Sequence, residues 1–207
     1  MKITAISPIN SATPQSIVEL ISKVSSGLVV LPGYAVNTPS VAAVRKVLSP
    51  GVFVFLESAD KQQAAPWLVS DEEETRMQPQ IFADSPKVQA LRNLEASFLE
   101  RTFLIGGHRV SFILCGEINA FQPDGSTKSG IELPFDVLVN PTHTPMGRWN
   151  ILGRKLAALS KDRVVVHVAN NTSGSRTLTT DARIYADGEQ VGHRSENSDA
   201  AWLIYEV

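Results

Sequence analysis

The 207-residue sequence has one cysteine, little net charge and no long hydrophobic run. A single cysteine excludes a disulfide within the chain and, since no histidine pair has metal-ligand spacing, provides no zinc framework. A formal charge of −2 provides no basic surface for nucleic acid. No apolar stretch approaches the roughly 20 residues that span a bilayer, and the one near Met1 is too short for a signal peptide. We therefore expect a cytoplasmic protein with no cofactor, metal, nucleic-acid or membrane partner.

Apolar runs alternate with amphipathic segments along the first part of the chain. Unbroken apolar runs are typical of buried strands, and residues at helical spacing separate them. Strands are expected at 2–7, 28–32 and 52–57, with helices at 13–24 and 40–47. The strand–helix–strand order favours parallel pairing and an α/β fold. Hydrophobic residues make up 43% of the chain, enough for one sizeable core, so a single domain over residues 1–207 is predicted.

The rest of the chain continues this alternation. Ser85-Pro86 is a typical helix start, with Ser85 as N-cap and Pro86 at the first helical position. Gly106-Gly107 and Asp187-Gly188 are typical of hairpin turns. The acidic run Asp71-Glu72-Glu73-Glu74 is most simply a solvated turn. Further strands are expected at 67–70, 103–105, 110–115, 135–139, 163–168 and 202–205, with a helix at 147–160 and polar loops at 121–130 and 170–175.

Cys115 ends the apolar run Phe112-Ile113-Leu114 and is followed directly by Gly116 and Glu117. Such a run is typical of a buried strand, and a glycine after it lets the backbone turn sharply. The turn would expose the sulfur with backbone N–H groups beside it, as a nucleophile requires. The alternative is an inert core thiol, because free cysteine is among the most buried residue types.

Four segments, in the same order, resemble the carbon–nitrogen hydrolase (nitrilase) superfamily. They are Leu28–Pro32, Leu114–Glu117, Asp136–Pro141 followed by Trp149, and Val164–Asn171. The resemblance implies a four-layer αββα sandwich, a nucleophile at Cys115, and hydrolysis or acyl transfer at amide or nitrile carbons. It also implies a homodimer, because relatives commonly pair through helices.

The resemblance breaks at two of the positions that it implies for catalysis. Family members use a Glu as general base, a Lys to stabilise the oxyanion and a Cys to form a thioester. Here Gly33 follows Pro32 at the Glu position, and Gln78 lies at the Lys position. A general base contributes roughly 10²–10⁴-fold and an oxyanion donor roughly 10²–10³-fold. The first hypothesis is therefore a non-catalytic or strongly impaired member that binds a small amide-like molecule or a partner protein. Gly33 also has a simpler interpretation, a turn residue after Pro32.

Other side chains are placed to replace the missing ones, which leaves enzymatic activity open. Glu57 closes the strand 52–57, where sites gather in α/β sheets. Glu117 lies two residues past the sulfur, although a carboxylate there commonly accepts backbone N–H bonds instead. Lys61 and Lys87 are candidate cations, and both are otherwise solvated surface residues. With Glu57 or Glu117 as base, the alternative function is an amidase or acyltransferase that forms a thioester on Cys115.

The pocket around Cys115 is expected to include Gly116, Asn140 and His143. His143 follows a strand end and is either a proton carrier or a residue that hydrogen-bonds within its loop. His167 lies inside an apolar strand and is expected to be a core histidine. A third hypothesis is a metal-dependent hydrolase, which needs oxygen and nitrogen ligands at strand ends. Its ligands would be drawn from Asn10, Glu57, Asn140, Asn170 and His193.

Overall fold

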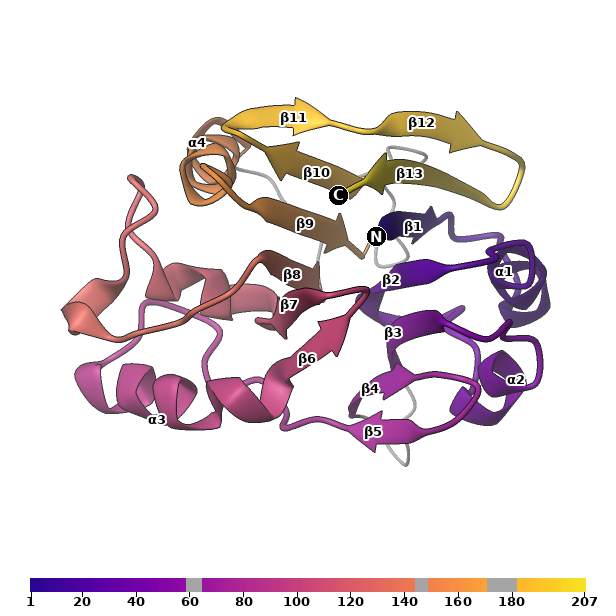
Figure 1. Cartoon of the computed structure of the whole chain (residues 1–207), viewed down its shortest axis with the longest axis horizontal. Coiled ribbons are helices and arrows are strands. Elements are labelled where there is room, and N and C mark those ends of the chain that lie inside the picture. The colour runs from indigo at the N-terminus through magenta and orange to yellow at the C-terminus, as the bar shows by residue number, and fades with distance from the viewer. Residues whose placement is uncertain (59–64, 144–148, 171–181) are drawn as a thin grey trace.

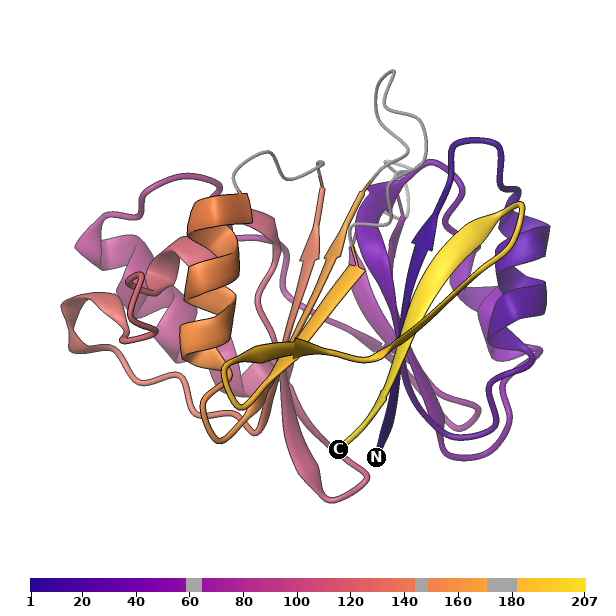
Figure 2. The same cartoon turned by 90° about the horizontal axis from the view of Figure 1, so that it is seen from above.

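The structure is a computed structural model that describes residues 1–58, 65–143, 149–170 and 182–207. These residues form two β-sheets packed face to face, with helices on each outer face (Figures 1 and 2). The layers therefore run helix, sheet, sheet, helix. This arrangement confirms the αββα sandwich expected from the sequence.

The first sheet has the strand order β12-β13-β1-β2-β3-β4-β5. Strands β1, β2 and β3 run parallel, as the strand–helix–strand pattern predicted, and the flanking strands pair antiparallel. The bounds are β1 (Lys2–Pro8), β2 (Gly27–Ala35), β3 (Val52–Ser58), β4 (Pro66–Val69), β5 (Glu74–Arg76), β12 (His193–Glu196) and β13 (Ala200–Glu206).

The second sheet has the order β11-β10-β9-β8-β7-β6, with β7, β8 and β9 parallel. The two predicted hairpins are confirmed, because β6 pairs antiparallel with β7 and β10 with β11. The bounds are β6 (Thr102–Ile105), β7 (His108–Phe112), β8 (Val137–Thr142), β9 (Val164–Ala169), β10 (Ala182–Ala186) and β11 (Glu189–Val191).

Local sequence explains where the first two helices begin. The Thr13 side chain accepts the Ser16 N–H at the start of α1, the Ser16 side chain accepts the Thr13 N–H in return, and Pro14 takes the first turn. Ser40 caps α2 by accepting the Ala43 N–H. The helices are α1 (Pro14–Ile21), α2 (Val41–Arg45), α3 (Val88–Phe98) and α4 (Trp149–Leu159), with 3₁₀ turns η1 (Leu99–Arg101), η2 (Cys115–Ala120) and η3 (Lys128–Gly130).

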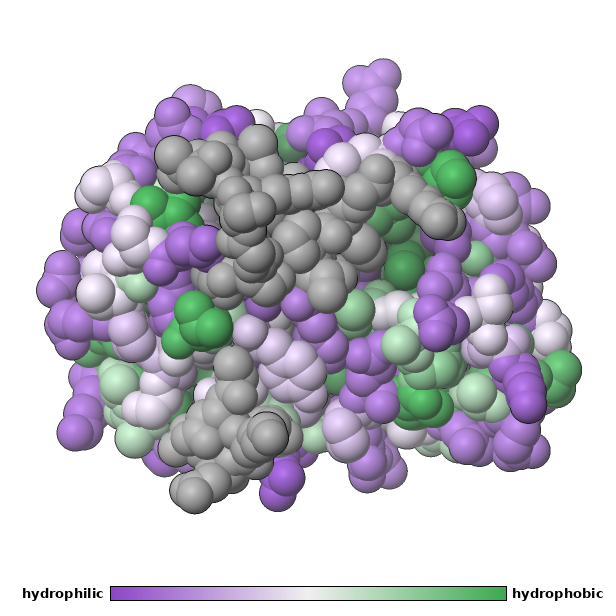
Figure 3. All heavy atoms as spheres, turned by 180° about the vertical axis from the view of Figure 1, so that it is seen from behind, coloured by the Kyte–Doolittle hydropathy of each residue, from purple (hydrophilic) through white to green (hydrophobic). Residues whose placement is uncertain are grey.

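None of the helices in the described residues is long and apolar enough to cross a bilayer. Seen from behind, the described surface is mostly hydrophilic, with apolar side chains scattered over it (Figure 3).

The two sheets share one apolar core. Phe55 of β3 stacks on Phe112 of β7, with 5.2 Å between the ring centroids. On the other face of β3, Val54 and Leu56 pack with residues of α1 and α2. Both faces of β3 are thus buried, which explains its unbroken apolar run. Because side chains alternate along a strand, Glu57 follows Phe55 onto the face between the sheets.

Several sequence expectations need correction. Helix α3 begins at Val88, after Lys87, rather than at Ser85-Pro86. The preceding segment is instead held by contacts with the turn at Cys115, described below. Strand β7 ends at Phe112, so Cys115 opens a 3₁₀ turn rather than ending the strand. The acidic run forms a turn only as far as Glu73, because Glu74 begins strand β5. Strands β5 and β12 were not predicted.

Candidate functional site

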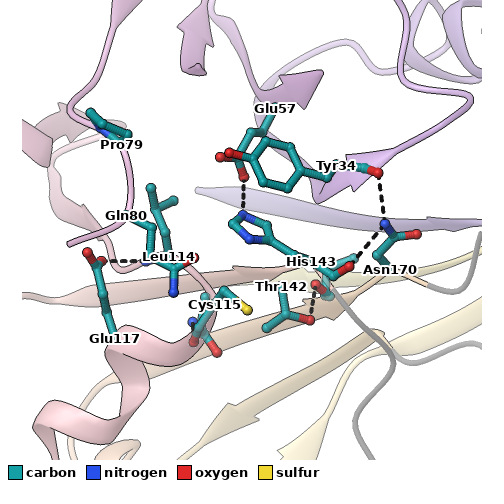
Figure 4. A network of polar contacts seen from close by, with 12 residues as sticks. Tyr34, Glu57, Pro79, Gln80, Leu114, Cys115, Glu117, Thr142, His143 and Asn170 are labelled. Atoms are coloured by element: carbon teal, nitrogen blue, oxygen red, sulfur yellow. Dashed lines mark hydrogen bonds and ion pairs between the residues drawn. The ribbon is translucent and has the colours of Figure 1, made fainter. Parts of the chain in front are cut away.

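Residues from five strand ends meet in one cluster (Figure 4). Tyr34 is the second-last residue of strand β2, and Glu57 is the second-last residue of strand β3. Cys115 follows β7, His143 follows β8, and Asn170 follows β9. These strands are parallel within their sheets, and ligand sites of α/β proteins lie at the carboxyl ends of such strands.

Cys115 sits on a tight, left-handed turn. Its φ of +42° is uncommon for a residue with a side chain and stores on the order of 1–3 kcal/mol. The buried Asn140 side chain holds the turn, because its Nδ2 donates to the carbonyl oxygens of Ile113, at 2.9 Å, and of Cys115, at 3.2 Å. The residue as a whole is partly exposed. Cys115 is therefore presented on a supported turn rather than packed into a strand.

Gly116 is required by a close approach of two backbone segments. A Cβ at this position would lie 1.8 Å from the carbonyl oxygen of Ala83. No side chain fits there, because real Cβ atoms do not approach closer than about 3 Å. Gly116 thus lets the segment before α3 pack directly on the Cys115 turn.

Glu117 fixes that packing through its two carboxylate oxygens. Oε1 accepts the Ile81 N–H at 2.7 Å, and Oε2 accepts the Leu114 N–H and the Arg101 guanidinium, each at 2.7 Å. Arg101 also donates to the Pro79 carbonyl oxygen at 2.6 Å, and the side chains of Glu117 and Arg101 are both 0% exposed. Glu117 therefore holds the turn as an acceptor of two backbone N–H groups and of Arg101.

Glu57 occupies the space that a side chain at position 33 would fill. Gly33 and Glu57 are direct partners in the β2–β3 register, which is irregular on both sides of Gly33. A Cβ on Gly33 would lie 2.5 Å from Glu57 Oε2 and 2.4 Å from His143 Cδ2. Gly33 is a strand residue, so its interpretation as a turn residue is wrong. The glycine instead makes room for a carboxylate from the next strand.

Glu57 is held on one side only. Its Oε2 lies 2.8 Å from His143 Nε2, whereas Oε1 is buried and has no hydrogen-bond partner among the described residues. The His143 ring stacks on Tyr34, with 3.9 Å between centroids. Asn170 Nδ2 donates to the carbonyl oxygens of Tyr34 and His143, at 2.9 and 3.3 Å. Among the described residues, these contacts position the carboxylate through Oε2 alone.

The field around the sulfur is negative. Burial raises the pKa of the Cys115 thiol, and the charges of Glu57 and Glu117 act in the same direction. Hydrogen bonds from the backbone N–H groups of His143 and Gly116 lower it, but burial is the largest effect. Burial also raises the pKa of Tyr34, and the charges of Glu57 and Cys115 raise it further. The resting sulfur is therefore a neutral thiol at neutral pH.

His167 lies beneath the site, as the core histidine expected. Asn140 Nδ2 is committed as a donor, so Asn140 Oδ1 accepts the His167 Nδ1–H at 2.9 Å. His167 is 0% exposed, and burial lowers its pKa to about 3. The neutral imidazole thus orients Asn140, which was expected to line the pocket and instead supports the Cys115 turn from below.

The remaining expectations concern cations and metals. Gln78 is exposed and lines a depression of about 320 Å³ with Arg76, Met77, Pro79 and Glu100. Its match to the family Lys stays a prediction. Lys87 is exposed before α3, and Lys61 lies outside the described residues. His193 is on β12, with three strands between it and Glu57 on β3, so His193 lies apart from this candidate metal ligand.

Sequence reasoning missed Tyr34 and Arg101. Tyr34 directly follows Gly33 at a strand end, and this position was a usable signal. No sequence signal pointed to Arg101, because its partners Glu117 and Pro79 are distant in sequence.

No protein-family model matches the sequence, and no curated protein is detectably similar to it. Solved structures are similar in fold. A carbon–nitrogen hydrolase superfamily protein from Xanthomonas campestris, with an arsenic adduct in its active site, has a TM-score of 0.61 and 13% identity, covering 100% of this chain and 90% of that one. An amidase variant from Nesterenkonia sp. AN1 in complex with butyramide has a TM-score of 0.60 and 14% identity, with coverage of 100% and 90%. The resemblance found in the sequence is thereby confirmed at the level of the fold.

Proposed function

We propose that the chain is a cysteine-dependent hydrolase or acyltransferase of small amides, with Cys115 as nucleophile and Glu57 as general base. The position of Glu57 supports this proposal, because its carboxylate fills the space in front of Gly33. The family Glu, which the resemblance puts at position 33, is thus replaced by a carboxylate that arises one strand away. A thiol that reacts has a precedent on this fold, because a Glu-to-Gln variant of the Nesterenkonia sp. AN1 amidase undergoes Michael addition of acrylamide at its active-site cysteine.

In the proposed reaction, the thiol proton passes to the free oxygen of Glu57 as Sγ attacks the amide carbon. The C–N bond then breaks, and the leaving amine takes the proton from Glu57. Water releases the acyl group from the thioester by the reverse route. Glu57 and Sγ share no direct hydrogen bond among the described residues, and catalytic hydrogen bonds are often long until substrate binds.

The alternative is the non-catalytic binding module. A specific observation favours it, because burial and two carboxylates raise the pKa of Cys115. A neutral, buried thiol reacts slowly, since the thiolate is the nucleophile. The two candidates therefore differ in whether Glu57 removes the thiol proton when a substrate is present.

Mass spectrometry of the intact protein separates the two. Incubation with a panel of small amides, nitriles and esters is expected to add one acyl group to Cys115. Cys115→Ala removes the adduct, and Glu57→Gln slows its formation by roughly 10²-fold or more. Glu189→Gln, the same change on the exposed strand β11, is the matched control and leaves the rate unchanged. Turnover that survives in Cys115→Ala, or no adduct from any compound, contradicts the proposal.

A further inference from the structure

One carboxylate oxygen of Glu57, Oε1, is buried without a hydrogen-bond partner among the described residues. Buried polar atoms are nearly always hydrogen-bonded, and a buried carboxylate oxygen left alone is costly. Glu57 is 0% exposed, and Oε1 has no partner among the described residues, whereas Oε2 is held by His143. The oxygen is therefore a fixed acceptor for which the described residues supply no donor.

The charges around this oxygen favour a cationic donor over a neutral one. Glu57 acts on Cys115 and Tyr34 and raises the pKa of both groups. The other nearby carboxylate, Glu117, is already matched by the Arg101 guanidinium. Among the described residues, the ion-pair partner of Glu57 is His143, at Oε2. A positively charged N–H group on Oε1 would form a charge-assisted hydrogen bond, which is roughly twice as strong as a neutral one.

We propose that Glu57 Oε1 binds the protonated nitrogen of an amidinium or guanidinium substrate, whose central carbon is attacked by Cys115. This inference rests on the proposed function and names its substrate class. A simple ammonium fits the acceptor but offers no electrophilic carbon, and a neutral amide offers the carbon without the charge. An amidinium group provides both in one planar unit.

The charge of the substrate also activates the nucleophile. A cation bound at Glu57 offsets the carboxylate charge that helps to raise the pKa of the Cys115 thiol. The thiol proton then moves to the carboxylate of Glu57 as the S–C bond forms at the amidinium carbon. One C–N bond breaks, and ammonia leaves with the proton from Glu57. Water attacks the S-linked intermediate, so amidinium and water give an amide and ammonium, with Cys115 restored.

Titration of the single thiol tests the inference directly. Cys115 is the only cysteine, so the pH dependence of its alkylation by iodoacetamide reports on that thiolate alone. Acetamidinium is compared with its neutral counterpart acetamide, at constant ionic strength. We expect acetamidinium to lower the Cys115 pKa by about one unit, a tenfold change in the acid dissociation constant, and acetamide to leave it unchanged. Equal effects of the two compounds overturn the inference.

Two variants locate the effect. Glu57→Gln keeps the shape of the side chain and removes its charge, so it is expected to abolish the response to acetamidinium. Glu189→Gln, on β11, is the matched control and is expected to keep it. A response that survives in Glu57→Gln overturns the assignment to Oε1. The comparison of the two compounds on the unaltered chain stands even where Glu57→Gln does not fold.

Ammonia release completes the test and separates the two proposals. Release from acetamidinium is expected to exceed release from acetamide by about tenfold or more, in line with the shift of the thiol pKa. Acyl adducts on Cys115 from neutral amides, with no preference for acetamidinium, overturn the inference and leave the proposed function standing. No adduct and no ammonia from either compound overturn both.

Discussion

The closeness of the Glu57 carboxylate to Gly33 depends on one geometric fact. Gly33 and Glu57 are paired residues on adjacent parallel strands, which lie about 4.8 Å apart. A side chain on one strand therefore reaches the space in front of its partner when the partner is glycine. The Glu57 side chain thus fills, from the neighbouring strand, the space in front of Gly33.

Gly33→Ala tests this at the residue scale. Its Cβ would overlap Glu57 Oε2 and His143 Cδ2, so both side chains must move. We expect a loss of about 1–3 kcal/mol in the free energy of unfolding, measured by urea denaturation. The loss should be smaller when Glu57 is also changed to Ala, because contacting residues are not additive. Equal losses in the two backgrounds would show that the side chains do not compete for this space.

His167 gives a pH-dependent prediction at the same scale. Its pKa is about 3 in the folded chain and near 6.5 when unfolded. Between these values the unfolded chain binds the extra proton, so the free energy of unfolding falls as pH drops from about 6.5 toward 3. The full effect is on the order of a few kcal/mol. His167→Gln should flatten this slope in urea denaturation between pH 7 and 4, and an unchanged slope would assign the loss to other groups.

Single residues of the site were predictable where chain position alone places them. Glu57 ends an apolar run, so its position at a strand end followed from the sequence. Cys115 also ends an apolar run, but it lies three residues past the end of β7, in the turn η2. The free Oε1 of Glu57 did not follow, because it depends on His143 arriving from the other sheet. The supporting role of Asn140 was also hidden, since its partners Ile113 and His167 lie on neighbouring elements.

At the scale of elements, the turn η2 and the segment before α3 behave as one unit. Glu117 joins them through Ile81, Leu114 and Arg101, and Gly116 lets their backbones touch. Ser85-Pro86 is a typical helix start, but α3 begins later, at Val88, after the segment that is joined to η2. Tertiary contacts outweigh local preference here.

Glu117→Gln tests the unit. The change leaves the Arg101 charge buried without its partner, and breaking such a pair costs about 3–5 kcal/mol. Glu196→Gln breaks an exposed pair with Arg194, where exposed pairs contribute about 0.2–1 kcal/mol. Urea denaturation of both variants measures the difference. Similar small losses in the two would mean that Glu117 does not fix the turn.

Strand prediction succeeded where strands are buried on both faces. Strands β3 and β9 are continuous apolar runs, and their burial on both faces explains why. The polar strands β5 and β12 were missed, because they lie at sheet edges and their residues are mostly exposed. An edge strand of this kind is recognised by its partner and carries little apolar pattern of its own.

At the scale of the whole molecule, the site exists only because two sheets face each other. Tyr34 and Glu57 come from the first sheet, and Cys115, His143 and Asn170 follow strands of the second. Apolar pattern predicts that each strand is buried but not which strands oppose it. The pairing of Phe55 with Phe112 across the sheets therefore could not be read from the sequence. The resemblance to a known fold supplied only the sandwich in which two sheets face each other.

Because the sheets share one core, we expect residues 1–207 to unfold as a single domain in one cooperative transition. Trp67 lies on the first sheet and Trp149 on a helix over the second, so each reports on one half. Thermal curves from tryptophan fluorescence and far-ultraviolet circular dichroism should coincide. Phe112→Ala removes the ring that joins the halves and should lower the free energy of unfolding by about 3–5 kcal/mol in both signals together. Two separate transitions would mean that each sheet and its helices hold together alone, and the site between them would then open before either half unfolds.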